Sequence, residues 1–251
     1  MICVLNIGNT NTAVGFGVDK IEDQFTIPTH AYQNPDEFIQ YFKDQNTHTN
    51  IEQCIIASVR PKEEMAVKQA LDNHLGIESI LLSHNDDFEM DLGLYASGKL
   101  GMDRILAMYG AKMIYGENIA VVDLGTATTI NVLSNNQFKG GAIMTGVRLG
   151  LSVLSEKTGL LPYVNVENTT DYLGLNTEDS LKAGALFSTV ATLKEYQRMI
   201  MNDYPDTSFV ITGGNAKIIL PLCDTHWNYE PDLVLHGILS WWGRKEIYYE
   251  N

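Results

Sequence analysis

The 251-residue chain is poor in cysteine and has no long apolar run. Its three cysteines, Cys3, Cys54 and Cys223, are far apart and form no Cys-x-x-Cys pair, so we expect buried free thiols in a reducing cytosol. No stretch approaches the roughly 20 apolar residues of a membrane span. Asn6 and Gly8 interrupt the first apolar run too early for a signal peptide. We therefore expect a cytoplasmic protein that makes no membrane contact.

Positive charge is also scarce, because 17 basic residues face 31 acidic ones and the formal net charge is −14. Such a charge repels phosphate backbones, which argues against nucleic acid as a partner. It would repel a nucleotide too, so a nucleotide site must depend on local backbone N–H groups. The six histidines show no spacing typical of a zinc site. With 45% apolar residues, the chain can form one large domain or two of roughly 100–150 residues.

Strand and helix patterns alternate along the chain, which is typical of an α/β fold. A helix over 34–45 is predicted with Asn34 as its cap and Pro35 at its first position, and a long helix over 176–200 with Thr177 as its cap. Further helices are expected at 61–76, 101–116 and within 146–159. Strands are expected at 2–6, 12–18 and 54–58, as a strand–turn–strand unit over 119–133, and over 208–216, where a strand runs into a glycine turn.

A repeat organises the chain. Residues 2–12 (ICVLNIGNTNT) match residues 119–129 (IAVVDLGTATT) at an offset of 117, with Ile, Val, Gly and the last Thr identical. Two copies predict two similar lobes. Residues 1–116 would carry the first phosphate loop and the GMDR sequence, and residues 117–251 the second loop and the long helix. If the loops face each other, one nucleotide would bind in the cleft between the lobes.

The two glycine turns are the strongest candidates for a phosphate site. Gly8 and Gly125 allow the backbone to approach an anion, successive N–H groups can form an anion nest, and neighbouring Asn and Thr side chains add donors. The alternative is a pair of ordinary β-hairpin turns, for which these residue types are also typical. The symmetric placement of the two turns favours phosphate binding.

The GMDR sequence at 101–104 places a carboxylate beside a guanidinium at a helix start. Asp103 could accept a proton from a substrate hydroxyl, and Arg104 could hold a carboxylate through two hydrogen bonds. Taken alone, the pair fits better with an acid stabilised by the helix dipole beside a solvated arginine. The glycine-rich stretches at 140–162 and 211–216 are ambiguous in the same way, since each could line a ligand or form a tight connection.

Eight motifs in this order resemble the type III pantothenate kinases of the actin-like and sugar-kinase ATPase superfamily. The resemblance covers nearly the whole chain and implies two ribonuclease-H-like lobes and a homodimer. It also implies transfer of the ATP γ-phosphate to pantothenate, which gives 4′-phosphopantothenate in the first step of coenzyme A synthesis. The motifs are NIGNTNT (6–12), GMDR (101–104), DLGTATT (123–129), GGAIMTG (140–146), KTGLLP (157–162), GLNTEDSLKAG (174–184), ITGGNA (211–216) and PDLVLHGIL (231–239).

The resemblance also implies a role for individual positions. Asp103 would be the catalytic base, Asp123 the ligand of a monovalent cation (K⁺ or NH₄⁺), and Asn6 a weak Mg²⁺ site. Tyr95 would close the pantothenate pocket, and Thr177 would reach pantothenate from the dimer partner. The ATP phosphates would be bound by Asn6, Ile7, Gly8, Asn9, Thr10, Asn11 and Thr12 with Thr126 opposite, and pantothenate by Gly101, Met102, Asp103 and Arg104.

An apolar stripe on the long helix after Thr177 suggests an interface, although part of it could pack within its own lobe. The stripe consists of Leu181, Ala185, Leu186, Val190 and Leu193.

Four positions depart from the family pattern, which has Asp, Pro, Ala and Glu where this chain has Asn6, Thr145, Gly159 and His236. Asn6 matters most, because an amide oxygen can ligate Mg²⁺ but brings no charge. A unit charge about 4 Å away is worth at most ~4 kcal/mol at an effective dielectric near 20, which is about a thousandfold in rate. A working kinase is the favoured interpretation. The alternatives are a non-catalytic regulatory relative on the same fold and a kinase for another small alcohol.

Overall fold

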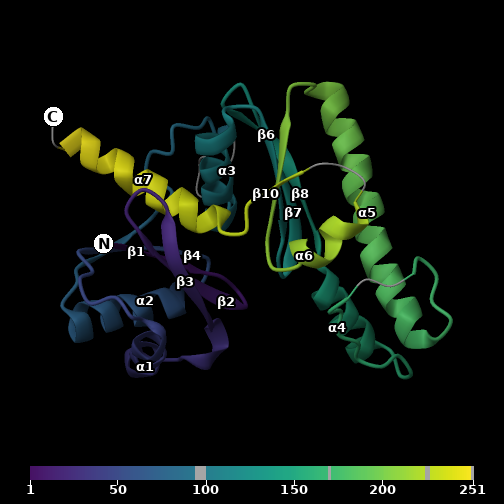
Figure 1. Ribbon diagram of the computed structural model, residues 1–251, viewed down its shortest axis with the longest axis horizontal. Coiled ribbons are helices and arrows are strands. Elements are labelled where there is room, and N and C mark those ends of the chain that lie inside the picture. The colour runs from purple at the N-terminus through teal and green to yellow at the C-terminus, as the bar shows by residue number, and fades with distance from the viewer. Residues whose placement is uncertain (94–99, 169–170, 224–226, 250–251) are drawn as a thin grey trace. The chain divides into compact units, whose positions relative to one another are not determined.

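The computed structural model describes residues 1–93, 100–168, 171–223 and 227–249 (Figure 1). The chain forms two compact units, Met1–Ile114 with Asp232–Asn251, and Tyr115–Pro231. The predicted division placed all of residues 117–251 in the second lobe. The structure differs at the C-terminus, because helix α7 (Leu233–Tyr249) packs on strands of the first unit. Among the helices of the described ranges, none has the length and apolarity needed to cross a membrane.

The first unit is built on a mixed five-stranded sheet of order β3-β2-β1-β4-β5. Strand β1 is antiparallel to β2 and parallel to β4. The strands are β1 (Ile2–Ile7), β2 (Asn11–Gly17), β3 (Ile21–Pro28), β4 (Gln53–Ser58) and β5 (Ser79–Leu81), and the helices are η1 (Thr29–Ala31), α1 (Pro35–Gln45), α2 (Pro61–Ala70) with its π-helical extension η2 (Leu71–Leu75), α3 (Met102–Tyr115) and α7.

The second unit repeats this design in a sheet of order β10-β9-β6-β7-β8. Strand β6 is antiparallel to β7 and parallel to β9, as β1 is to β2 and β4. The α/β fold class is therefore confirmed. The strands are β6 (Ile119–Leu124), β7 (Ala127–Ser134), β8 (Gln137–Thr145), β9 (Ser208–Thr212) and β10 (Asn228–Tyr229), and the helices are α4 (Val147–Lys157), α5 (Thr177–Asp203), α6 (Ala216–Ile219) and η4 (Leu220–Leu222).

The two turns between the paired strands differ in length. Ile7 pairs with Thr12, whereas Leu124 pairs with Thr128, so four residues separate the first pair and three the second. The structural counterpart of Thr12 is therefore Thr128, not Thr129 as the sequence repeat placed it. Both hydroxyl residues are buried, with exposed fractions of 0% and 3%.

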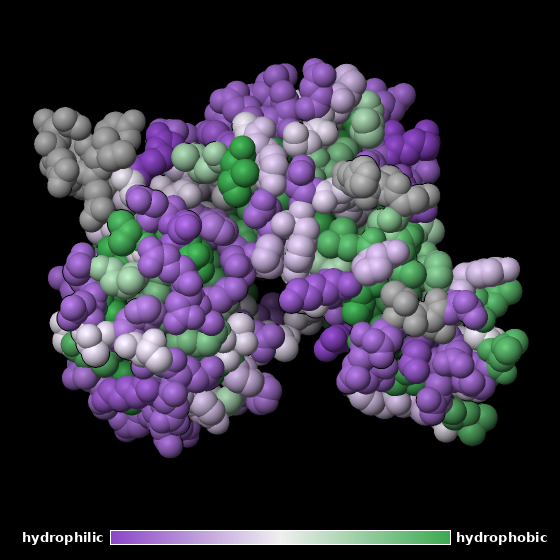
Figure 2. Space-filling view, viewed as in Figure 1, coloured by the Kyte–Doolittle hydropathy of each residue, from purple (hydrophilic) through white to green (hydrophobic). Residues whose placement is uncertain are grey.

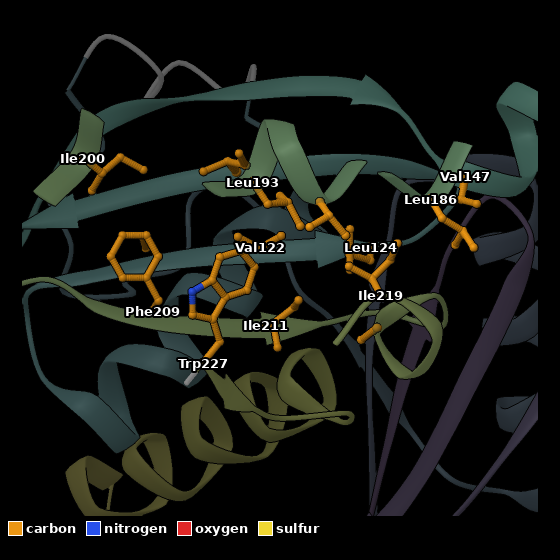
Figure 3. Packing of buried hydrophobic residues seen from close by; sticks show 14 of the residues in the cluster. Val122, Leu124, Val147, Leu186, Leu193, Ile200, Phe209, Ile211, Ile219 and Trp227 are labelled. Atoms are coloured by element: carbon orange, nitrogen blue, oxygen red, sulfur yellow. The ribbon is translucent and has the colours of Figure 1, made fainter. Parts of the chain in front are cut away.

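Each unit has its own apolar core. In the first unit, Phe16 of β2 packs against Phe42 of α1 with ring centroids 6.2 Å apart. In the second, Phe209 and Trp227 stack at 6.1 Å. Figure 3 shows Leu186 and Leu193 of α5 with residues of the central strands in this second core. Burying one such aliphatic side chain contributes about 1.5–3 kcal/mol. The two cores therefore stabilise the sheets from whose strands the turns extend.

Asparagine side chains cap the N-termini of α1 and α5. The Asn34 side chain caps α1 by accepting the Glu37 N–H at 3.0 Å, as predicted. The cap of α5 was predicted at Thr177, but the structure places it one residue earlier. Asn176 has extended backbone, and its Oδ1 accepts the Asp179 N–H at 2.9 Å. An N-cap residue typically has extended backbone and a side chain that accepts the second or third helical N–H, and asparagine is among the best caps. Thr177 already lies within the helix, so it cannot be the cap.

Candidate functional site

The first turn presents its tip to solvent. Asn9, Thr10 and Asn11 are exposed, and Gly8 behind them is partly buried. The Gly8 N–H donates to the Asn11 carbonyl at 3.0 Å, which closes the turn. A Cβ on Gly8 would lie only 2.9 Å from that same oxygen, so glycine fits this position best. Donors for an anion must therefore come from Asn9–Asn11 rather than from the glycine.

A buried hydrogen-bond network supports this turn from inside the unit. The Thr29 hydroxyl donates to the Gly8 carbonyl at 2.9 Å, and the Thr29 N–H donates to the Thr10 carbonyl at 2.9 Å. The Thr12 hydroxyl lies 3.1 Å from the Thr29 hydroxyl and 2.7 Å from the Tyr32 hydroxyl. Burial raises the pKa of Tyr32 to about 12. Thr12 therefore holds the turn, and its buried hydroxyl is not presented at the surface of the loop.

Two predicted ATP residues lie within β1. The Ile7 side chain is fully buried in the core, so it can act only through its backbone. The Asn6 side-chain oxygen is buried and has no hydrogen-bond partner among the described residues. Leaving such an acceptor unpaired costs about 1–3 kcal/mol. A hydrogen bond from a metal-bound water, or from a donor group of a bound ligand, would remove that cost.

Asp123 occupies the matching place in the second sheet. It pairs with Thr212 on the parallel strand β9, as Asn6 pairs with Ala57 on β4. Its carboxylate lies against two glycine turns. A Cβ on Gly125 would be 3.3 Å from Oδ1, and a Cβ on Gly213, which has a φ of +93°, would overlap that oxygen. Space and backbone conformation therefore both require glycine at position 213.

The second turn is held by the two glycine-rich stretches that the sequence left ambiguous. The Gly146 N–H donates to the Thr126 carbonyl at 3.1 Å. The Asn215 side chain donates to the Gly125 carbonyl at 3.0 Å, and the Asn215 N–H to the Leu124 carbonyl at 2.9 Å. Thr126 itself is exposed. Residues 123–126, 146 and 213–215 thus form one cluster at the end of β6.

The GMDR sequence forms the first turn of α3. Asp103 Oδ1 accepts the Arg104 N–H at 2.8 Å, and the Gly101 carbonyl accepts the N–H groups of Arg104 and Ile105 at 3.1 Å each. The Asp103 carboxylate folds back over Gly101, where a Cβ would lie 2.5 Å from Oδ1. Met102 is 3% exposed, so its side chain anchors the helix rather than facing a substrate. Asp103 and Arg104 are partly buried, and the carboxylate is fixed where the helix dipole favours a negative charge.

Thr177 is exposed at the first position of α5. It borders an open groove of about 570 Å³ in the second unit, together with Leu160, Pro162, Asn176 and Glu178. Tyr95 lies outside the described residues, so its predicted role at the pantothenate pocket rests on the resemblance alone.

Comparison with known proteins identifies the family of the chain. The model of the type III pantothenate kinase family matches residues 2–199. The chain belongs to the type III pantothenate kinase family. The type III pantothenate kinase of Bifidobacterium longum subsp. infantis is 30% identical over 249 residues, which cover 95% of this chain and 96% of that protein. That of Fervidobacterium nodosum is 27% identical over 250 residues, 98% of each chain.

A crystal structure from Campylobacter jejuni, provisionally described as a Baf family transcriptional activator, has the same fold. Its TM-score is 0.66 and its sequence identity 22%, over 98% of this chain and 99% of that one. At this identity the likeness shows the fold alone. The two family members named above cover 95% and 98% of this chain, so each match extends over both units.

Sequence reasoning missed the residues that hold the turns. Thr29 is 21 positions from Gly8, and Asn215 is 90 positions from Gly125. Asn215 falls within the ITGGNA motif, which drew attention to the segment but not to its contact with the second turn. Thr29 and Tyr32 carry no motif, and only the pairing of β3 with β2 brings them behind the first turn.

Proposed function

We propose that this protein is an ATP-dependent pantothenate kinase that phosphorylates the primary hydroxyl of pantothenate in the first step of coenzyme A biosynthesis. Membership of the type III pantothenate kinase family supports this function. The observation that carries it is the intact GMDR turn, in which Gly101 leaves room for the Asp103 carboxylate at the start of α3. The two glycine turns at matching sheet positions supply sites for phosphate groups.

In this proposal the backbone of Asn9–Asn11 and the exposed Thr126 face the ATP phosphates, while Ile7, Gly8 and Thr12 keep the first loop in shape. Asp103 positions the pantothenate hydroxyl and accepts its proton late in the transfer. A free Asp has a pKa of roughly 3.9 and is a weak base, but phosphoryl transfer depends mainly on positioning and charge stabilisation. Gly101 and Arg104 line the acceptor pocket, with Thr177 contributed by a second copy of the chain.

We assign the two proposed cation sites to the side-chain oxygens of Asn6 near the end of β1 and Asp123 near the end of β6. Mg²⁺ is normally bound by one or two carboxylates together with substrate phosphates. The Asn6 oxygen, which is buried and has no partner within the described part of the chain, fits a water of the magnesium shell, but the triphosphate must supply most of the negative charge. The single carboxylate of Asp123 between two glycine turns fits one monovalent cation, K⁺ or NH₄⁺.

A homodimer is proposed from the apolar surface around α4. The stripe on α5 largely packs within its own unit, because Leu186, Val190 and Leu193 belong to the core. Other large apolar side chains are exposed instead, and several green residues lie among purple ones at the rim of the second unit in Figure 2. Such a patch is typical of an interface. Its members are Leu149, Val153 and Leu154 on α4, and Leu160, Tyr163, Tyr172, Leu173 and Leu175 after it.

A cytoplasmic location is consistent with the use of ATP and with the absence of a disulfide at Cys3, Cys54 and Cys223 among the described residues. One assay tests the function, namely ADP release that depends on added pantothenate in the presence of K⁺. We expect turnover with pantothenate. A folded dimer without turnover would indicate the regulatory alternative, and turnover only with a different alcohol would indicate another small-molecule kinase.

A further inference from the structure

The two turns share a feature that the sequence repeat does not encode. In each turn, a glycine carbonyl accepts a hydrogen bond from a buried side chain. A second carbonyl, that of Thr10 or Thr126, accepts one from a backbone N–H. In the first turn both donors belong to Thr29, which bonds Gly8 through its hydroxyl and Thr10 through its N–H. In the second turn the Gly125 carbonyl is bonded by the Asn215 side chain. The side-chain donors are 1% (Thr29) and 6% (Asn215) exposed.

These bonds determine where the neighbouring N–H groups point. A trans peptide is planar, so its C=O and N–H point in opposite directions. A donor that holds the Gly8 carbonyl toward the interior therefore turns the Asn9 N–H outward, and the same holds for Gly125 and the Thr126 N–H. An anion site needs outward N–H groups, because an outward carbonyl would repel phosphate oxygens. Asn9 and Thr126 are both exposed.

The hydroxyl network gives the first bond a fixed direction. A carbonyl can only accept, so the single hydrogen of the Thr29 hydroxyl is used toward Gly8. The Thr12 hydroxyl must then donate to Thr29, and the Tyr32 hydroxyl to Thr12. The raised pKa of Tyr32, about 12, keeps that first donor protonated. The chain of donors runs from Tyr32 through Thr12 and Thr29 to the phosphate loop.

We propose that Thr29 and Asn215 are matched positioning residues, which orient the Asn9 and Thr126 N–H groups toward the phosphates of a bound nucleotide. This inference rests on the proposed ATP site. Neither residue need touch the nucleotide. Thr29 acts through the Gly8 carbonyl of the first turn, and Asn215 acts through the Gly125 carbonyl of the second. Removing either donor leaves a partly buried carbonyl without that hydrogen bond and lets the peptide rotate, which disorders the N–H groups that bind phosphate.

The test is ATP binding by titration calorimetry and steady-state kinetics with the full-length protein and three threonine variants. Thr29→Val keeps the shape but removes the hydroxyl, and Thr29→Ser keeps the hydroxyl. Thr207→Val is the matched control, since the Thr207 hydroxyl also donates to a carbonyl, that of Tyr204 at 2.8 Å, away from either turn. We expect Thr29→Val to raise the Kd and the KM for ATP about tenfold, with the KM for pantothenate within about twofold of the parent. Thr29→Ser and Thr207→Val should bind ATP like the parent.

Asn215→Ala provides the second arm and should also raise the Kd for ATP about tenfold, because the Leu124 bond to its backbone N–H survives and the turn stays folded. Thermal unfolding of every variant separates loss of fold from loss of binding. Equal ATP affinity for the parent, Thr29→Val and Asn215→Ala would overturn the inference and leave the proposed kinase intact. A parent protein that binds no ATP at all would overturn both.

Discussion

Asn6→Asp is the substitution that best tests how this chain handles magnesium. It replaces the amide nitrogen of a side chain near the end of β1 with an oxygen. The oxygen that Asn6 already carries is buried and finds no hydrogen-bond partner in the ranges that the structure describes. The second sheet carries Asp123 at the matching strand position, so the fold accommodates a carboxylate at such a place. The new charge would be unfavourable in the protein alone and favourable when Mg–ATP is bound.

The magnitude has an upper limit. A carboxylate about 4 Å from one net unit of positive charge, which is Mg²⁺ partly neutralised by the triphosphate, gains at most ~4 kcal/mol at an effective dielectric near 20, equivalent to about a thousandfold in affinity or rate. Part of this gain is lost by taking the charge out of water. We therefore expect about a 10- to 100-fold gain in kcat/KM for ATP at low free Mg²⁺, with a smaller gain at saturating Mg²⁺.

Unliganded Asn6→Asp should be less stable than the parent. Burial raises the pKa of a carboxyl in the folded state above its unfolded value. The contribution of Asp to stability is then present below the unfolded pKa of roughly 3.9 and is lost as pH rises through the folded pKa. Denaturant unfolding should therefore show a deficit at pH 7 that shrinks toward pH 4 and also shrinks when Mg–ATP is added.

Steady-state kinetics of both proteins across a magnesium titration, with the unfolding curves as a control for fold, decide the matter. If Asn6→Asp is no better than the parent at any Mg²⁺ concentration, Asn6 does not face the metal shell. If activity falls at every concentration while the fold is intact, the site is adapted to a neutral residue and the carboxylate repels the triphosphate.

Three further results are expected. Asp103→Asn should lower kcat by about 10² or more while the protein stays folded and loses at most about 1 kcal/mol of stability with the charge at the helix start, and near-parental turnover would remove Asp103 from the mechanism. Leu175→Glu, at a side chain that is 100% exposed, should shift light scattering from dimer to monomer and lower activity, whereas a monomeric parent with full activity would refute the dimer. Burial raises the pKa values of Tyr32 and Tyr109 to about 12 from 10, so each contributes stability that is present below pH 10 and lost between about pH 10 and 12. Denaturant unfolding across that range should show the loss, Tyr32→Phe should reduce it, and a flat profile would contradict it.

The sequence by itself determined the family and the central elements of each unit, whereas β3, β5, β8, β10, α6 and α7 were not predicted from it. Apolar periodicity and end signals act over three or four residues, so Asn34 and Gly76 mark helix ends that the structure reproduces. The repeat at residues 2 and 119 predicted two similar lobes, and the structure shows two sheets with corresponding strand orders. The ordered motifs were sufficient to identify the type III pantothenate kinase family, because they span both units.

Only the tertiary structure decided how the turns are built and held. The extra residue in the first turn follows from strand register, which an ungapped repeat of eleven residues cannot reveal. The bonds from Thr29 to Gly8 and from Asn215 to Gly125 cross 21 and 90 residues, and strand pairing alone brings those groups together. Helix α7 joins the first unit for the same reason, because its apolar residues can be buried against β1 and β4 only after both ends of the chain have met. Local sequence preference specifies which elements form, and the distant donors that orient the phosphate loops exist only once those elements have packed.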